Sequence, residues 1–149
     1  MTRRQLSIRA SRTGDKPDLF RMAKLLWPDQ PEREVEQDVH GWDPSDVIVV
    51  ERDASRLAGF VQLGERSFAE GCATSPIGYV EGWFVDEDLR RQGVGAALMG
   101  AALEWCRSRG YAELASDAQL GNETSIRAHL ALGYQLVERI VCFRKPVAR

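Results

Sequence analysis

The sequence predicts a protein of mixed α/β (α+β) class, in which one mixed sheet carries helices on both faces. Several short segments alternate apolar and polar residues, as half-buried strands do, and others repeat apolar residues every three or four positions, as amphipathic helices do. The two kinds of segment follow the order β-α-α-β-β-β-α-β-α-β. No repeat or low-complexity tract interrupts this order in the 149 residues. We therefore expect a single domain over residues 1–149.

The first part of the chain predicts one strand and two helices. Leu6 to Ala10 alternates apolar and polar residues, as a strand does. Pro17 suits the first turn of a helix, and Trp27-Pro28 ends that helix because a residue before proline is pushed out of the helical region. Pro31 starts a second helix, from Glu32 to about His40, with an acidic first turn that complements the helix dipole. Trp27 lies between these helices and either caps the core or contacts a ligand.

The middle of the chain predicts three strands in succession. Val47 to Arg52 and Leu57 to Glu65 are joined by a turn at Asp53 to Arg56. A longer loop, Arg66 to Pro76, follows and carries Phe68. Loops of this size near a binding site often determine specificity. Tyr79 to Val85 is rich in aromatic and β-branched residues and predicts the next strand.

The last third predicts a helix, a strand, a helix and a strand. A long helix that Gly110 ends is indicated by one apolar stripe, formed by Val94, Leu98, Ala101 and Trp105. Glu113 to Asp117 predicts a short buried strand, Asn122 caps the next helix and Gly133 ends it. Tyr134 to Lys145 alternates and predicts a final strand. Because no partner strand follows it, we expect its edge to pair with a second subunit in a homodimer.

The turn before the long helix has the chemistry of an anion site. It reads Arg90-Arg91-Gln92-Gly93-Val94-Gly95. The first N–H groups of a helix have no internal partner and carry partial positive charge. Glycines at positions 93 and 95 leave these amides open to a pyrophosphate, and the two arginines add charge-assisted hydrogen bonds. The alternative is an ordinary βα connection that contains two glycines.

Three phosphate-binding patterns compete for this turn. A nucleoside-triphosphate loop needs a Lys-Ser or Lys-Thr pair, and the sequence contains neither. A dinucleotide fingerprint needs a third small residue where Leu98 stands, although Asp117 lies at a suitable distance for a ribose contact. The third pattern, Arg/Gln-x-x-Gly-x-Gly/Ala after a strand, is met by Arg90, Gly93 and Gly95. The sequence therefore favours the third pattern.

Composition narrows the classes of partner. The formal net charge is −2 and the pI is near 5.7, which disfavours nucleic acid and suits small cationic partners. The cysteines at 72, 106 and 142 show no Cys-x-x-Cys spacing, and the histidines at 40 and 129 lie far apart. Neither a disulfide framework nor a metal site is expected. No apolar stretch is long enough to span a bilayer, so we expect a soluble, cytoplasmic protein.

The motif formed by Arg90, Gly93 and Gly95 resembles that of the GCN5-related N-acetyltransferase (GNAT) family. The resemblance to this family extends over most of the chain. The resemblance implies a mostly antiparallel sheet that is splayed where its central strand, Tyr79 to Val85, bulges. It also implies acetyl-CoA as cosubstrate, with its pantetheine arm in the gap and a freed backbone N–H as oxyanion donor. The residues so implied for acetyl-CoA are Trp83, Phe84, Val85, Arg90, Arg91, Gln92, Gly93, Val94, Gly95, Ala96, Asn122 and His129.

His129 stands where many members of this family carry a tyrosine, four residues before the glycine that ends the last helix. In those members the tyrosine is the acid for the departing thiolate. Histidine donates protons near neutral pH. The resemblance therefore implies for His129 either this acid role or only a hydrogen bond to the cofactor, and the residues alone also fit a structural role.

One subset of the family is more similar. Five short segments resemble the aminoglycoside 6′-N-acetyltransferases in order and spacing, namely Leu26-Trp27-Pro28, Gly71-Cys72 with Ser75-Pro76, Val80-Glu81-Gly82, Ala115-Ser116-Asp117 and Glu138-Arg139. Two positions differ, because Phe68 stands where relatives show tyrosine and Gln30 where some show histidine. The residues implied for the aminoglycoside are Trp27, Gln30, Phe68, Glu81, Asp117 and Glu138.

The acidic residues agree with a cationic substrate. Glu81 and Asp117 are expected near the open ends of adjacent strands, facing one cleft. Glu81 lies within an apolar run, where an unpaired carboxylate is unfavourable. Aminoglycosides are polyamines, and grouped carboxylates attract and orient such molecules. The alternative for each acid taken alone is a surface ion pair.

These observations predict an acetyl-CoA-dependent N-acetyltransferase that modifies the 6′-amino group of aminoglycosides by direct attack in a ternary complex and confers resistance. Glu81 or Asp117 accepts the proton of the amine, directly or through water, and alignment of amine and thioester contributes to the rate. No covalent intermediate is expected, because no cysteine lies beside an obvious base. The alternatives are acetylation of another amine, such as a polyamine, peptide or lysine, and a non-catalytic CoA-binding sensor.

Overall fold

The computed structural model describes residues 6–53 and 56–148, so the turn expected at Asp53 to Arg56 lies partly outside the described residues. Its five strands form one sheet in the order β1-β2-β3-β4-β5. Their bounds are Ser7–Ala10, Val47–Asp53, Arg56–Arg66, Ile77–Val85 and Leu114–Ala115. The pairs β1–β2, β2–β3 and β3–β4 are antiparallel, and the pair β4–β5 is parallel. The predicted mixed, mostly antiparallel sheet is confirmed.

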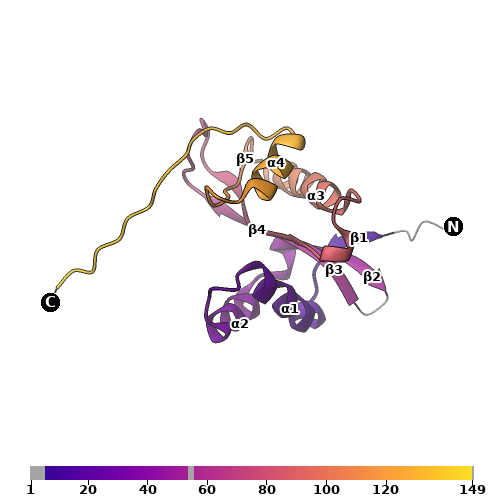
Figure 1. Ribbon diagram of the computed structural model, residues 1–149. Helices are drawn as coiled ribbons and strands as arrows, with labels where there is room; N and C mark the ends of the chain where they lie inside the picture. The colour runs from indigo at the N-terminus through magenta and orange to yellow at the C-terminus, as the bar shows by residue number, and fades with distance from the viewer. Residues whose placement is uncertain (1–5, 54–55, 149) are drawn as a thin grey trace.

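Helices cover both faces of this sheet, as predicted (Figure 1). α1 (Lys16–Leu26) and α2 (Glu32–Gly41) lie on one face, and α3 (Val94–Arg109) and α4 (Glu123–Ala131) lie on the other. Three short 3₁₀ turns connect elements: η1 (Thr13–Asp15), η2 (Pro44–Asp46) and η3 (Glu87–Leu89). The core is accordingly divided into two main layers. One is packed between the sheet and α1–α2 around Phe60, and the other between the sheet and α3 around Leu98.

The predicted bulge of the central strand is present in β4. Gln62 of β3 pairs with Gly82, but Leu63 pairs with Val80, so Glu81 is an extra residue without a counterpart. Val80 and Trp83 pack with the α3 layer. Glu81 and Gly82 both face the α1–α2 layer, because each lies beside Trp27.

The predicted splay of the sheet is also present. β5 pairs with β4 only through Leu114 with Gly78 and Ala115 with Tyr79. β4 continues to Val85, whereas residues 116–122 form no strand beside it. The strand expected at Glu113 to Asp117 is therefore shorter than predicted, because the two strands separate after Ala115.

α3 packs closely onto β4 at its first turn. Its N-cap residue Gly93 has a φ of 83°, and the C-terminal Gly110 has a φ of 76°, so both occupy the left-handed region that favours glycine. A Cβ at Gly95 would lie 2.9 Å from Cζ2 of Trp83. The buried face of the helix consists of Val94, Leu98, Met99, Ala102, Trp105 and Cys106.

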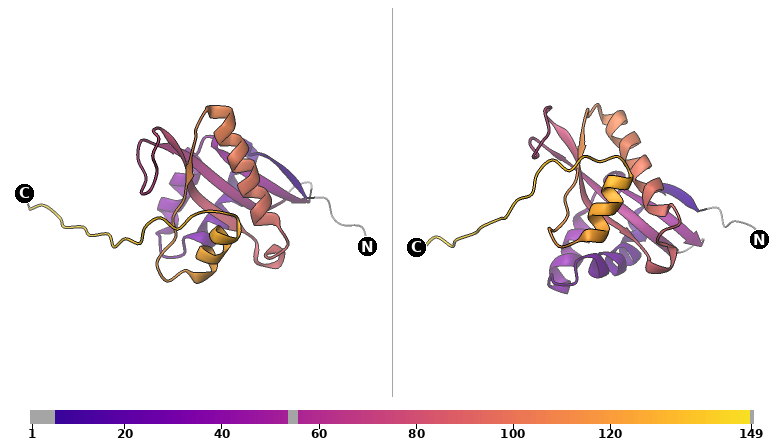
Figure 2. Two further views of the ribbon diagram at one scale, coloured as in Figure 1. Left: turned by 90° about the horizontal axis from the view of Figure 1, so that it is seen from above. Right: turned by 45° about the horizontal axis from the view of Figure 1, so that its top comes forward.

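The prediction of a final strand from Tyr134 to Lys145 is wrong for this chain as described. Residues 134–148 have no regular secondary structure, and the chain leaves the body of the protein toward its C-terminus in both views of Figure 2. The start of the segment still contacts the body, because Tyr134 packs edge to face on His129 and Val137 lies against Gly71. Phe143 is 91% exposed and Val141 is 67% exposed. A strand needs a neighbour to pair its backbone groups, and this segment pairs with no strand among residues 6–53 and 56–148.

No helix within residues 6–53 and 56–148 is both long enough and apolar enough to cross a membrane.

Two glycines of α3 allow a matched stability test of the contact with Trp83. Gly100→Ala should raise the unfolding free energy by about 0.5–1 kcal/mol, because alanine loses less backbone entropy in a helix and a Cβ there meets nothing within 4 Å. Gly95→Ala should lower it, because strain against Trp83 of about 1–3 kcal/mol exceeds that gain. Urea unfolding measures both, and equal stability of the two variants would contradict the contact.

Candidate functional site

A pocket of about 700 Å³ opens between the α1–α2 layer and strands β3 and β4. Three residues predicted to contact a substrate, Trp27, Gln30 and Glu81, line it together. The other lining residues were not predicted, because they lie on α2, at its C-cap or on β3 and match no motif. These are Gln37, Asp38, Gly41, Trp42, Gln62, Leu63 and Gly64.

Trp27 packs against the core and also lies at the surface of the pocket. Its ring packs edge to face on Trp42, with 6.2 Å between ring centroids, and Trp42 in turn lies 5.7 Å from Phe60 of the core. Trp27 also lines the pocket. A Cβ at Gly82 would lie 2.9 Å from this ring, so the bulged strand can approach the tryptophan only with glycine there.

Glu81 is not an unpaired carboxylate, because Arg66 at the end of β3 binds it through two hydrogen bonds. Arg66 Nε donates to Oε1 at 3.0 Å and Nη2 donates to Oε2 at 2.8 Å. This is the bidentate geometry that favours Arg–carboxylate pairs. The carboxylate also lies over Gly64, where a Cβ would be 3.1 Å from Oε1. The pairing with Glu81 is the main cause that raises the pKa of Arg66.

Asp117 joins the same cluster through Tyr79. The Tyr79 hydroxyl donates to Oδ2 of Asp117, and the Arg66 guanidinium lies 3.5 Å from the centre of the Tyr79 ring. Burial, followed by the bond to Asp117, raises the pKa of Tyr79 well above its ordinary value, so the phenol stays a donor. Glu81, Arg66, Tyr79 and Asp117 are thus one connected polar cluster, in which Tyr79 and Arg66 were not predicted.

Asp117 belongs to this cluster but not to the pocket lining, and two further predicted substrate residues are also absent from the lining. Phe68 is 69% exposed on the 67–76 loop and is absent from the lining. Glu138 is exposed in the irregular segment 134–148, whose C-terminal part leaves the body of the protein (Figure 2). Sequence pattern alone gives no information on such placement, because both residues lie in segments without regular structure.

His129 on α4 is held by hydrogen bonds at both ring nitrogens. Nδ1 lies 2.7 Å from the Ser125 carbonyl oxygen, and Nε2 lies 2.8 Å from Oγ of Ser116. Because a carbonyl only accepts, the Nδ1 atom carries the proton and the Ser116 hydroxyl donates to Nε2 in the neutral imidazole. The rings of Trp83 and Tyr134 flank the imidazole edge to face, at 5.3 Å and 5.2 Å.

Asn122, also predicted for the cofactor, caps α4 as expected from the sequence. Its side-chain oxygen accepts from the Ser125 backbone N–H at 3.2 Å. The cap fixes the first turn of α4, which contains Ser125. The carbonyl oxygen of Ser125 in turn accepts the hydrogen bond from Nδ1 of His129, four residues later.

The first turn of α3 is open to an anion. Gly93 contributes no side-chain cap, and the turn contains no acidic residue. Gly93 and Ala96 are exposed, so the unpaired amides face solvent. The sequence reasoning assigned Gly95 to ligand access as well, but the structure gives it the further role of admitting Trp83. Arg91 has a φ of 61°, a strained conformation for a residue with a side chain and one that is common at ligand sites.

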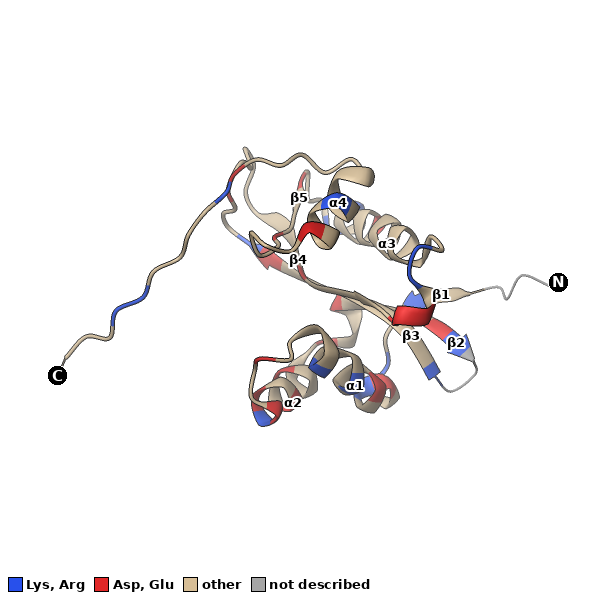
Figure 3. Cartoon of the chain, viewed as in Figure 1, with Lys and Arg blue, Asp and Glu red and all other residues tan. Residues whose placement is uncertain are grey.

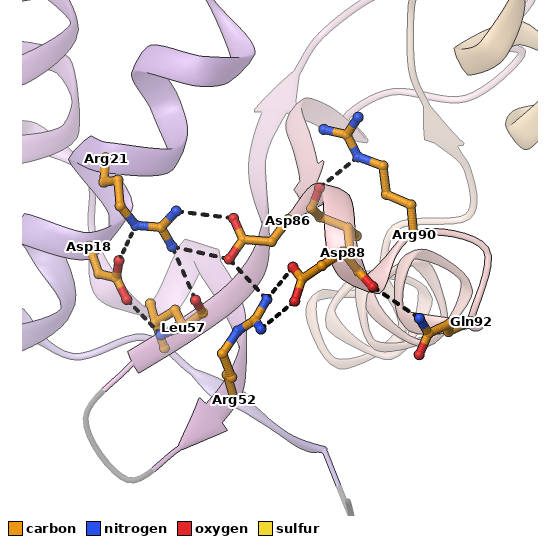
Figure 4. Close-up of polar contacts among 9 residues, drawn as sticks. Asp18, Arg21, Arg52, Leu57, Asp86, Asp88, Arg90 and Gln92 are labelled. Atoms are coloured by element: carbon orange, nitrogen blue, oxygen red, sulfur yellow. Dashed lines mark hydrogen bonds and ion pairs between the residues drawn. The ribbon is translucent and has the colours of Figure 1, made fainter.

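Arg90 and Trp83 also bear on a ligand at this turn. Arg90 Nε donates to the Val85 carbonyl at 2.9 Å, so the guanidinium lies at the end of β4 (Figure 4). The Trp83 indole N–H is buried and has no hydrogen-bond partner within the described part of the chain. Buried donors are rarely left unpaired. Both features fit a ligand with acceptor atoms that passes between β4 and α3.

Residues 6–53 and 56–148 hold no group of three or more His, Cys, Asp or Glu side chains that is arranged to bind a metal ion.

Comparison with known proteins connects this arrangement to one family. A family model described as the Acetyltransferase (GNAT) family matches residues 16–134. An aminoglycoside N(6′)-acetyltransferase type 1 of Klebsiella aerogenes is 38% identical over 146 residues, which cover 94% of this chain and 96% of that protein. Its counterpart from Stenotrophomonas maltophilia is 32% identical over 144 residues, which cover 95% and 94%.

Solved structures agree with these sequence matches. AAC(6′)-Iy in complex with the bisubstrate analogue CoA-S-monomethyl-acetylneamine superposes with a TM-score of 0.87 at 28% identity, over 96% of this chain and 99% of that chain. AAC(6′)-Ih from Acinetobacter baumannii superposes with a TM-score of 0.83 at 26% identity, over 97% of this chain and 100% of that chain.

The tautomer of His129 can be tested directly, because the sequence contains only two histidines. In ¹⁵N NMR of the imidazole nitrogens we expect neutral His129 to carry its proton on Nδ1, with Nε2 shifted by the Ser116 hydrogen bond. Ser116→Ala should shift the Nε2 resonance of His129 and leave that of His40 unchanged, because His40 is exposed on α2. An Nε2-protonated His129 would contradict the hydrogen-bond assignment.

Proposed function

The chain belongs to the acetyltransferase (GNAT) family, and from this premise we propose that it transfers the acetyl group of acetyl-CoA to the 6′-amino group of aminoglycosides. The main observation in support is the pocket beside the bulge of β4, which is lined by Glu81, two tryptophans and several polar side chains. Full-length relatives with this activity in their names support it. So does a relative solved with a CoA–aminoglycoside analogue.

The pocket has the size and chemistry for an aminoglycoside. Its volume of about 700 Å³ lies in the range of small-molecule sites, roughly 300–1,000 Å³. Carboxylates at Asp38 and Glu81 pair with ammonium groups, and the glutamine amides of the lining hydrogen-bond to hydroxyl groups. The faces of Trp27 and Trp42 offer apolar surface for a sugar ring. Asp117 adds a carboxylate to the cluster next to Glu81.

The start of α3 fits the diphosphate of acetyl-CoA, which supplies an activated acyl thioester. The residues that would hold the diphosphate are Arg90, Arg91, Gln92, Gly93, Val94, Gly95 and Ala96, through charge and unpaired amides. The residues that would border its pantetheine arm are Trp83, Phe84 and Val85, beside the gap that opens after Tyr79 pairs with Ala115. Asn122 and His129 border the same gap from α4. No metal takes part in the proposed reaction.

In a direct attack of the amine on the thioester, different side chains of the protein accept and donate the protons. Glu81 or Asp117 accepts a proton from the substrate ammonium, directly or through water. Both carboxylates are held in place before the substrate arrives, by Arg66 and Tyr79 respectively. His129 contacts Ser116 through Nε2, so a proton that protonated His129 gives to a departing thiolate passes by way of the Ser116 hydroxyl. Nitrogen loses two protons on the way to the amide: the first leaves the ammonium for the carboxylate and is released to solvent, and the second, lost as the amide forms, balances the proton gained at sulfur.

An acetyl-transfer assay tests this function. Thiol release should be fast with kanamycin and tobramycin and slow with spermine and a peptide panel. Glu81→Gln and Asp117→Ala should each lower kcat/KM by about 10²-fold, the usual contribution of a proton-transfer group. Glu51→Gln is a matched control, because Glu51 is ion-paired with Arg9 on β1 and lies outside the pocket lining.

The outcomes of this assay separate the alternatives. Turnover of spermine or peptides above the aminoglycosides would contradict the substrate and indicate another amine. Binding of acetyl-CoA without turnover of any amine would indicate a non-catalytic sensor. Wild-type rates for Asp117→Ala would exclude its role.

We propose that the protein is a homodimer in which residues 134–148 pair with a second copy. This segment exposes apolar side chains at alternating and neighbouring positions, namely Leu136, Val137, Ile140, Val141, Phe143 and Val147. β5 forms one edge of the sheet and is only two residues long. An unpaired edge and an unpaired apolar segment complement each other. The exchange would also carry Glu138 toward a substrate of the partner.

Light scattering tests the dimer. The native protein should have about twice the mass of one 16.7 kDa chain, and Ile140→Asp/Val141→Asp should shift it to the monomer because charge opposes pairing. Leu25→Asp is the control, since Leu25 is 59% exposed on α1, and it should leave the dimer intact. A monomeric native mass would contradict the proposal.

We further propose that residues 1–149 are a single acetyltransferase domain that works in the cytoplasm, where acetyl-CoA is available. Acetylation converts the 6′-ammonium to a neutral amide and removes one cationic contact from the drug. The predicted biological effect is aminoglycoside resistance.

A further inference from the structure

The turn before α3 combines an anion site with three acidic residues. Asp86, Glu87 and Asp88 directly precede the basic sequence, and Figure 3 shows the acidic η3 turn beside the basic loop that enters α3. The two segments are joined, because the Gln92 amide donates to the Asp88 carbonyl at 3.0 Å. Charges this close to a bound anion act within the Debye length of about 8 Å at physiological salt. Uncompensated carboxylates here would therefore oppose a diphosphate.

Two arginines from other elements pair with these carboxylates (Figure 4). Arg52 of β2 binds Asp88 through two hydrogen bonds of 2.6 Å and reaches Asp86 at 3.4 Å. Arg21 of α1 binds the other side of Asp86, at 3.0 Å and 3.3 Å. The hydrogen bonds from Arg52 are the main cause that lowers the pKa of Asp88, which therefore stays charged and paired.

Arg52 and Arg21 differ in what else they bind. Arg21 also donates to Asp18 and to the Leu57 carbonyl, so it ties α1 to β3. The described hydrogen bonds of Arg52 all go to Asp86 and Asp88. Its side chain is only 20% exposed, whereas that of Asp88 is 61% exposed. Arg52 is thus fixed on the sheet and directed at the acidic turn alone.

Stability gives a weak reason for this arrangement, because exposed ion pairs contribute about 0–1 kcal/mol. The effect of these carboxylates on a bound anion gives a stronger reason for the arrangement. The arginines neutralise the two carboxylates that flank the turn and leave the positive charge of Arg90, Arg91 and the helix N-terminus uncancelled.

We infer that Arg52 is a positioning residue for the anionic acyl carrier: it neutralises Asp88 and Asp86 and fixes the η3 turn, so that the start of α3 presents net positive charge to a diphosphate. The inference rests on the proposed binding of acetyl-CoA at this turn. Arg52 does not touch the carrier. It acts through Asp88, whose backbone is bonded to Gln92 of the binding loop.

The first measurement is the Kd of CoA by titration calorimetry over a range of salt concentrations. Arg52→Gln should weaken CoA binding by about three- to tenfold at low salt, and the difference should shrink as salt rises, because the exposed charges become screened. Arg52→Lys keeps the charge and should bind within about twofold of the native protein. Arg109→Gln is the control for net charge, because its Asp46 pair lies at the far end of the 16-residue α3, about 24 Å away.

The second measurement separates charge from structure. Arg52→Gln/Asp88→Asn removes the acid together with its partner and should restore the Kd to within about twofold of the native value. Acetyl transfer from S-acetyl-N-acetylcysteamine, which has no phosphate, should proceed at the same kcat/KM in the native protein and in Arg52→Gln. Unfolding curves verify that each variant is folded.

Each outcome decides the inference. A native Kd for Arg52→Gln, a loss that salt does not reduce, or a loss that Asp88→Asn fails to restore would overturn it while leaving the proposed function intact. An equal loss with the phosphate-free donor would also overturn it, because the effect would then be structural. Native protein that binds no CoA at all would overturn the proposed function and this inference together.

Discussion

Side chains alternate between the two faces of a β-strand, and the bulge at Glu81 breaks that alternation once in β4. Glu81 faces the α1–α2 layer, and Gly82 faces the same layer because of the extra residue. Trp83 is thereby turned to the opposite face, under the first turn of α3 and against His129. Without the bulge, β4 would not place Glu81 and Gly82 at the pocket and also Trp83 under the first turn of α3.

Much of the fold could be predicted from the sequence, because its signals are local. Prolines and glycines mark the ends of α1, α2 and α3, and Asn122 caps α4 through its own side chain. Strand boundaries in the middle of the chain follow the alternation to within about two residues. The prediction of a final strand was wrong because alternation of apolar and polar residues shows only that a segment is able to pair. Whether a strand forms there depends on a pairing partner, which the alternation of a single segment does not encode.

The candidate site was predictable only where a motif carries the chemistry. The start of α3 and the two acids, Glu81 and Asp117, follow from short sequence patterns. Their partners Arg66 and Tyr79 do not, because the contacts come from strand pairing and the bulge rather than from spacing. The same holds for Asp38 and Trp42, which reach the pocket through the packing of α2 on the sheet. Gly95 shows a related limit, since its close neighbour is a tryptophan 12 positions earlier.

The bidentate bond between Arg66 and Glu81 means that a carboxylate lining the pocket is already paired with a cation of the chain itself. An incoming ammonium that pairs with Glu81 must share the carboxylate with this guanidinium or displace it, so recognition becomes an exchange of one positive partner for another. The free energy of such an exchange is a difference between two similar terms. A monovalent amine gains little from it, whereas a rigid polycation that also reaches Asp38 and Asp117 gains at each additional carboxylate. Arg66 thus makes binding selective for the number of positive charges on the ligand and not only for their sign.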